Sequence, residues 1–147
     1  MYYFETNFPV RYYETDQMAI VHHSNYIRYF ECARTEMLIA LDYPIEAIEA
    51  DGVVMPVVSV TCKYKHSAKM GDVLRVVCMI DKVPLAKLPI REEVYNQDGV
   101  LCAEGVVTIG FLDKVTGRPV ACPPKFTKIL EERINDKYYE KNKLRQI

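Results

Sequence analysis

The sequence lacks the features that mark several large classes of protein. Its five cysteines form no C-x-x-C pair, and it contains no tryptophan. No apolar run approaches the roughly 20 residues that span a bilayer, and residues 1–7 do not combine a basic region with an apolar one. We therefore expect a cytoplasmic protein with reduced thiols and no membrane span.

The sequence also has no large excess of positive or negative charge. The formal net charge is −1 at pH 7, and no basic run is interleaved with aromatic residues, so we expect no nucleic-acid partner. Half of the residues are apolar, which favours a folded globule. The length suits a single domain over residues 1–147, with residues 135–147 as a charged C-terminal tail.

What the sequence does contain is a loop with reactive side chains, residues 13–26, directly before its most helix-like segment. This loop carries the carboxylate of Asp16 and the imidazoles of His22 and His23. The first turn of a helix has unpaired backbone N–H groups and a partial positive charge, so it stabilises a nearby anion. A carbonyl group under attack develops such an anion, while a carboxylate can activate water or attack the carbon itself. The arrangement therefore indicates acyl transfer.

The segment after this loop has the spacing of a long helix. Apolar residues recur at intervals of three and four between positions 26 and 41. We expect Ser24 or Asn25 to cap the first turn, and the proline at position 44 to end the helix. So much of the helix surface is apolar that other elements should wrap around it.

The rest of the chain predicts mostly strands. The expected segments are a strand at residues 8–15, a helical turn at 44–51, strands at 57–66, 73–80, 88–94 and 101–111, a hairpin turn at 96–99 and a helix at 125–134. Strands that follow one another without intervening helices form antiparallel sheets. We therefore predict an α+β fold in which an antiparallel sheet of about five strands curls around the long helix.

These motifs resemble the hotdog-fold acyl-CoA thioesterases of the 4-hydroxybenzoyl-CoA thioesterase type. The similarity is carried by YETD at 13–16, IVHHSNY at 20–26 and RYFECAR at 28–34, with weaker support from MGD at 70–72. It extends over most of the chain, from about residue 8 to about residue 130. The resemblance implies a sheet wrapped around a central helix, edge-to-edge pairing into a homodimer or further into a homotetramer, and an active site at the subunit interface.

The resemblance also implies roles for particular residues. The catalytic aspartate of the family falls on Asp16, its frequent histidine on His23, and its Asn-Tyr pair on Asn25 and Tyr26. One departure is Ala19, because the family commonly has glycine there. Alanine is strained at that position if the backbone needs a positive φ.

Each candidate also has a plainer explanation. Asp16 taken alone is more often a turn residue than a catalyst, and with its motif it would act as general base or as nucleophile. Asn25 is as well suited to capping the helix as to orienting water or the thioester. Tyr26 would donate its backbone N–H to the oxyanion, and His23 would position the substrate. Adjacent histidines point apart in a regular backbone, so we leave His22 outside the site and expect no metal.

Polar and basic residues on the strands are candidates for contacts with coenzyme A. Some family members hold the CoA phosphates with a basic cluster, which is thinned here to Lys82, Lys87 and Arg91. Solvated lysines on a sheet face are the commoner explanation of such residues. The substrate-binding candidates are Ser59, Thr61, Lys63, Lys87 and Arg91.

We therefore predict an enzyme that hydrolyses an acyl-CoA thioester to a free acid and coenzyme A, without a cofactor. Sulfur is a good leaving group, so neither a metal nor a serine triad is required. One alternative is a non-catalytic hotdog module that binds acyl groups or an acyl carrier protein. Another is a dehydratase, although the spacing from Asp16 to His23 fits the thioesterase arrangement better. The sequence leaves open the acyl group, the choice between CoA and carrier protein, and dimer against tetramer.

Overall fold

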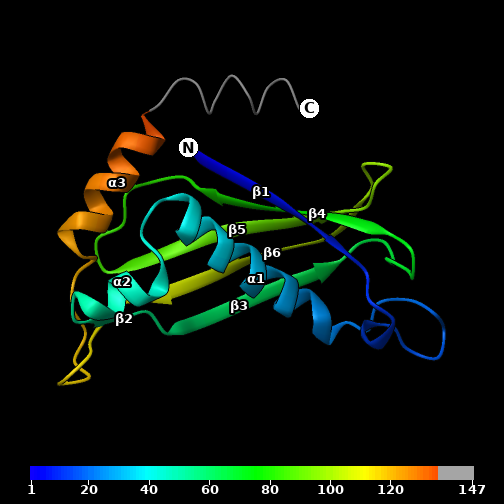
Figure 1. The fold of residues 1–147 in the computed structure, drawn as a ribbon, viewed down its shortest axis with the longest axis horizontal. Helices are drawn as coiled ribbons and strands as arrows, with labels where there is room; N and C mark the ends of the chain where they lie inside the picture. The colour runs from blue at the N-terminus through cyan, green and yellow to red at the C-terminus, as the bar shows by residue number, and fades with distance from the viewer. Residues whose placement is uncertain (136–147) are drawn as a thin grey trace.

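The computed structural model describes residues 1–135, which form a curved sheet with a long helix across its concave face (Figure 1). The elements are β1 (Tyr2–Pro9), the 3-10 turn η1 (Tyr12–Glu14), α1 (Ser24–Ala40), α2 (Ile45–Ala50), β2 (Val53–Val54), β3 (Val57–Tyr64), β4 (Val73–Ile80), β5 (Lys87–Tyr95), β6 (Leu101–Gly110), β7 (Leu112–Asp113) and α3 (Pro124–Ile134). Beyond its first residue, the predicted tail at 135–147 lies outside the described residues.

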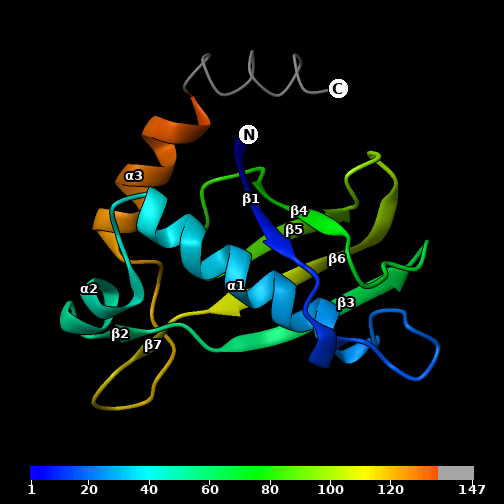
Figure 2. The same cartoon turned by 45° about the vertical axis from the view of Figure 1, so that its right-hand side comes forward.

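The main sheet has five strands in the order β1-β4-β5-β6-β3, and all neighbouring pairs are antiparallel. A separate ladder of two short strands, β2 and β7, lies beside α2 and was not predicted (Figure 2). The predicted α+β architecture, about five antiparallel strands against one long helix, is confirmed. β1 and β3 are the edge strands of the main sheet.

One side of α1 packs on the sheet. It packs chiefly on β4, β1 and β3. Successive side chains of a strand point to opposite faces, so only alternate residues of a strand face the helix. Two isoleucines on other sides of α1, Ile27 and Ile39, are 44% and 60% exposed. The sheet therefore covers only part of the helix within one chain. The buried apolar residues of α1 are Tyr26, Tyr29, Phe30, Ala33, Met37 and Leu38.

Two sequence predictions near the N-terminus are wrong. The first strand lies at Tyr2–Pro9 and not at residues 8–15. It ends there because Glu14 accepts a hydrogen bond from the Arg11 N–H (2.8 Å), which folds the following residues into η1. The predicted cap is also displaced, because His23 takes the N-cap position of α1 without a side-chain hydrogen bond.

The structure also bears on the expectations of reduced thiols and of no membrane span. All five cysteines are free, and Cys78, Cys102 and Cys122 are buried while Cys32 is exposed. Within residues 1–135, none of the helices is long and apolar enough to cross a membrane.

Gly105 of β6 has no room for a side chain. A Cβ added there would collide with the carbonyl oxygen of Thr61 and lie 3.1 Å from the ring of Phe30. Glycine is therefore required here for space, since the residue has extended backbone within a strand.

The core under α1 also contains a carboxyl group. Glu92 of β5 is fully buried, and its Oε1 accepts a hydrogen bond from the Cys78 thiol (3.1 Å). Its Oε2 has no hydrogen-bond partner among the described residues. Burial raises the pKa of Glu92 to about 8, against smaller lowering effects of Cys78 and Arg34. The carboxyl group is therefore mostly protonated at neutral pH.

Gly105→Ala should lower the free energy of unfolding by about 3 kcal/mol, because the new methyl group displaces backbone and not a flexible side chain. Gly110→Ala is the matched control. Its Cβ would lie at an ordinary 3.4 Å from Val58 Cγ1, so its stability should stay within about 1 kcal/mol of the wild type. Urea unfolding measures both, and equal stabilities would contradict the packing argument.

Glu92→Gln should remove a pH dependence of stability. The native state holds one more proton than the unfolded state between pH 4.5, the ordinary pKa, and about 8. The stabilisation is therefore complete below pH 4.5 and is lost as the pH rises through 8. Relative to Glu92→Gln, the wild type should lose about 4 kcal/mol between pH 5 and pH 9. Glu93→Gln, on the opposite face, should keep the wild-type profile in the same unfolding experiments.

Candidate active site

The loop that carries Asp16 is closed by its own backbone. The Asp16 N–H donates to the carbonyl oxygen of Ile20 (2.9 Å), and the Ala19 N–H donates to that of Asp16 (3.0 Å). One carboxylate oxygen of Asp16, Oδ1, accepts the N–H of Met18 (2.8 Å). These bonds fix the position of the carboxylate, and its second oxygen, Oδ2, takes no part in them.

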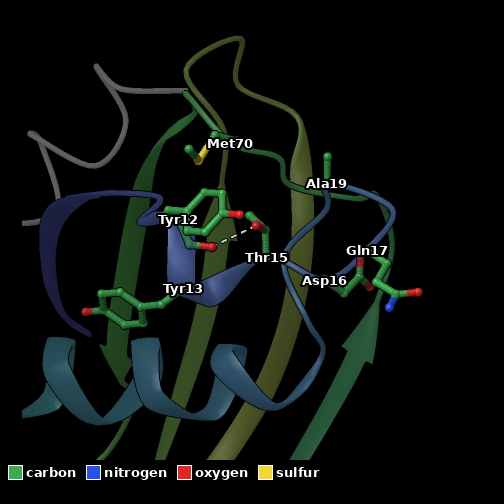
Figure 3. Close-up of a pocket in the computed structure, with 7 residues that line it drawn as sticks. All are labelled: Tyr12, Tyr13, Thr15, Asp16, Gln17, Ala19 and Met70. Carbon is green, nitrogen blue, oxygen red and sulfur yellow. Dashed lines mark hydrogen bonds between the residues drawn. The ribbon is translucent and has the colours of Figure 1, made fainter.

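Ala19 has a φ of 62°. This value lies in the left-handed region, where an L side chain costs about 1 kcal/mol or more. The position at which the resemblance implies glycine therefore does need a positive φ, and the loop holds that conformation with alanine. Figure 3 shows the methyl group of Ala19 pointing away from the loop.

A buried glutamate holds the base of the loop. Glu14 is 5% exposed, and its carbonyl oxygen accepts two bonds, from the His22 N–H (2.9 Å) and from Asn25 Nδ2 (2.9 Å). The carboxamide of Asn25 therefore joins the first turn of α1 to η1. Asn25 does not line the cleft described next, and sequence reasoning did not identify Glu14 as its partner.

A cleft of about 450 Å³ lies where the loop, the start of α1 and the end of β3 meet. The structure brings three of the four predicted catalytic residues to it, namely Asp16, His23 and Tyr26. Four further lining residues come from the end of β3 and the segment directly after it, and they were not among the predicted catalytic residues. They are Tyr64, Lys65, His66 and Ser67.

Aromatic rings form one wall of this cleft. The ring of Tyr64 lies 6.1 Å from that of His23 and 5.4 Å from that of Tyr26, centroid to centroid. Tyr64 donates its hydroxyl to the carbonyl oxygen of His23 (3.4 Å), and Tyr26 accepts the N–H of Ala68 (3.3 Å). Burial raises the pKa of Tyr26, so its phenol stays protonated.

The two histidines do not point apart as a regular backbone would require. Their ring centroids are 4.2 Å apart, with an angle of 31° between the ring planes. Nδ1 of His22 lies 2.9 Å from Ser24 Oγ, and His22 is not part of the cleft wall. Within residues 1–135, no three His, Cys, Asp or Glu side chains are grouped to hold a metal ion.

Backbone amides at the start of α1 carry weak hydrogen bonds. The Tyr26 N–H donates to the carbonyl oxygen of His23 at 3.3 Å, and the Ser24 N–H donates to His22 Nδ1 at 3.3 Å. Both distances exceed the usual 2.9–3.0 Å. Of these two residues, Tyr26 lines the cleft, and its amide retains part of its capacity to donate to an anion.

Asp16 also borders a second hollow, of about 670 Å³, on the outer side of the loop. In Figure 3 the ring of Tyr12 lies beside Met70, while Tyr13 points away from both of them. Tyr12, Tyr13 and Met18 are strongly exposed in the single chain. The loop that carries Asp16 is therefore surrounded by apolar surface on its outer side.

The predicted coenzyme A contacts lie elsewhere in this chain. Thr61, Lys63 and Arg91 border a hollow of about 300 Å³, on the sheet face opposite α1 by strand alternation. Arg91 forms a two-point ion pair with Asp81 (2.8 and 3.0 Å). Ser59 and Lys87 lie on strands β3 and β5 and border neither this hollow nor the cleft. Their role in binding coenzyme A stays a prediction.

Known proteins resemble this chain in sequence and in structure. A family model described as the thioesterase-like superfamily matches residues 10–130. The acyl-CoA thioester hydrolase YbgC of Escherichia coli O157:H7 is 32% identical over 117 residues, which cover 78% of this chain and 87% of that protein.

Two solved structures show the same architecture. The crystal structure of TT1821 from Thermus thermophilus has a TM-score of 0.81 at 33% identity and covers 88% of this chain and 98% of that one. The DHNA-CoA thioesterase of Staphylococcus aureus has a TM-score of 0.77 at 25% identity, with 99% and 93% covered. The chain therefore belongs to the thioesterase-like superfamily and has its hotdog fold.

Proposed function

We propose that this protein hydrolyses acyl-CoA thioesters to a free acid and coenzyme A, with Asp16 and the first turn of α1 as its catalytic groups. The observation that supports this most directly is the shared cleft of Asp16, His23 and Tyr26. The similarity to the acyl-CoA thioester hydrolase of E. coli supports the same reaction class.

Asp16 can act in either of two ways. As a general base, its carboxylate takes a proton from water while the water oxygen bonds to the thioester carbon. As a nucleophile, it bonds to that carbon itself and forms a mixed anhydride, which water then hydrolyses. In both routes the C–S bond breaks and the thiolate of coenzyme A leaves with a proton from the solvent or the acid.

The negative charge that develops on the carbonyl oxygen of the thioester needs hydrogen-bond donors. We assign this role to the N–H of Tyr26, whose present bond to His23 is long at 3.3 Å. The partial positive charge of the first turn of α1 adds to it. We assign to His23, which lines the same cleft, a hydrogen bond to the thioester.

We also propose that the enzyme is a homodimer paired through β3. This edge strand is eight residues long, and Val57, Val58, Val60 and Tyr64 are exposed along it. A long, exposed, apolar edge tends to pair with another strand. A two-fold axis normal to the sheet keeps each residue and its copy on the same face, so we propose antiparallel pairing about Val60. Val60 then lies opposite Val60 of the partner subunit and Lys63 lies opposite Val57 of the partner subunit, so like charges are not opposed.

Asp16→Asn should lower the rate of hydrolysis at least 100-fold on the best acyl-CoA substrate. Asparagine keeps an Oδ1 that can accept the Met18 N–H, so the loop should keep its shape. Asp98→Asn, in the exposed turn between β5 and β6, is the control and should retain wild-type activity. Thiol release measures all three proteins, and melting temperatures check their folding.

If Asp16→Asn keeps most of the rate, the assigned role is wrong. If the wild type binds acyl-CoA in calorimetry with a saturating isotherm and without heat from turnover, the protein is a binding module. The same assays with acyl carrier protein thioesters distinguish the two carriers.

Val60→Lys should convert the dimer to a monomer, because the two-fold pairing brings two introduced charges close together. Val60 is 36% exposed in the single chain, so the monomer should remain folded. Val115→Lys, at a 92% exposed position in the turn after β7, is the control and should stay dimeric. Light scattering after size-exclusion chromatography gives both masses, and a monomeric wild type would refute the pairing.

A further inference from the structure

Tyr64, the last residue of β3, contacts two of the residues assigned to catalysis, but the proposed reaction gives it no role. Its ring lies 6.1 Å from that of His23, edge to face at 74°, and 5.4 Å from that of Tyr26 at 59°. In the strand register Tyr64 pairs with Ala103 of β6, which is fully buried. Paired residues of antiparallel strands share a face, so Tyr64 projects from the sheet toward the start of α1.

The hydroxyl of Tyr64 shares its acceptor with the proposed oxyanion donor. The carbonyl oxygen of His23 accepts the Tyr64 O–H at 3.4 Å and the Tyr26 N–H at 3.3 Å. A carbonyl oxygen has two lone pairs, so it can accept both bonds. Because two donors share the electron density of one oxygen, each bond is weaker than it would be alone. The Tyr26 N–H is therefore held loosely and can bond to a substrate.

The same hydroxyl reduces the cost of that change of partner. When the Tyr26 N–H bonds to the oxyanion, the carbonyl oxygen of His23 loses a donor, and an unpaired polar group costs free energy. The Tyr64 O–H remains on this oxygen, so part of that cost is avoided. The benefit arises only when negative charge forms on the thioester oxygen, and it therefore stabilises the transition state rather than the bound substrate.

Tyr64 also connects His23 to the sheet. The imidazole of His23 stacks on that of His22, which is itself bound to Ser24 through Nδ1 and Oγ (2.9 Å). Both of these partners belong to the loop and the first turn of α1, so they cannot place His23 relative to the rest of the fold. Tyr64 contacts the ring and the carbonyl group of His23 from β3, so it sets their position relative to the sheet.

We propose that Tyr64 is a positioning residue for thioester hydrolysis, an inference that rests on the proposed function. Its ring holds the imidazole of His23. Its hydroxyl occupies the carbonyl oxygen of His23, which leaves the Tyr26 N–H available to the oxyanion. Such a residue affects kcat and leaves KM unchanged, because it acts in the transition state. A side chain that contacts acyl-CoA directly would change KM instead.

Tyr64→Phe removes the hydroxyl and keeps the ring. On the best acyl-CoA substrate, kcat should fall about fivefold, the effect of one hydrogen bond, while KM stays within about twofold. Tyr64→Leu, which removes the ring contacts as well, should lower kcat further. Since Tyr64 is 51% exposed, both variants should fold, and melting temperatures check this. An unchanged kcat in Tyr64→Phe, or a higher KM at wild-type kcat, would overturn the inference.

Tyr95→Phe is the matched control. It also removes a hydroxyl that is hydrogen-bonded at the end of a strand, because Tyr95 donates to Glu93 Oε2 at 2.7 Å. Tyr95 borders none of the hollows around Asp16, so its variant should keep the wild-type kcat and KM. An equal loss of kcat in Tyr95→Phe and Tyr64→Phe would show a general effect of a missing hydroxyl and would overturn the specific role of Tyr64.

The amide proton of Tyr26 gives a readout that does not depend on turnover. In Tyr64→Phe the carbonyl oxygen of His23 is left to the Tyr26 N–H, so this bond should shorten and the NMR signal of its proton should move downfield. A merely structural loosening of the first turn would lengthen the bond and move the signal upfield. An upfield movement, or an unchanged signal, would overturn the inference.

The two measurements distinguish the role of Tyr64 from the function on which it rests. A wild type without activity on any acyl-CoA ester would refute the proposed function, and the inference with it, whatever the Tyr26 signal does. An active wild type whose Tyr64→Phe variant keeps the full kcat would overturn only the role of Tyr64.

Discussion

The packing of α1 on the concave face of the sheet is the contact on which the other features depend. Tyr29, Phe30 and Met37 are almost completely buried against the strands, and Gly105 allows the helix to approach the backbone of β6 and β3. Burial of these side chains fixes the helix along its length. The same contact therefore sets the position of its first turn relative to the end of β3, where the cleft forms.

A second set of bonds transfers this rigidity from the helix to the loop. Asn25 is held by α1, and its carboxamide binds the carbonyl oxygen of Glu14, which also accepts the His22 N–H. The loop with Asp16 begins and ends at these residues. A carboxylate on a loop is thus held by a helix that is itself held by the core, which is the support that a catalytic group requires.

Much of the fold could be predicted because it depends on periodicity. The apolar spacing of α1 and the alternation of β3, β5 and β6 follow from side-chain directions alone. The first strand was misplaced because the side chain of Glu14 turns the backbone at Arg11, a contact that periodicity does not contain. Asp16, His23 and Tyr26 were found through a motif, whereas Tyr64 and His66 reach the cleft only through the path of β3. These two residues could be placed at the cleft only by knowing that the end of β3 faces the start of α1, and this depends on the sheet topology.

The backbone at Ala19 has an effect on motion as well as on shape. A left-handed alanine raises the energy of the observed loop conformation by about 1 kcal/mol relative to glycine. This reduces the energy difference between that conformation and any other in which the φ of Ala19 relaxes. A change of that size multiplies the population of such conformers about fivefold. The segment that carries Asp16 is consequently opened more readily than it would be with glycine at this position.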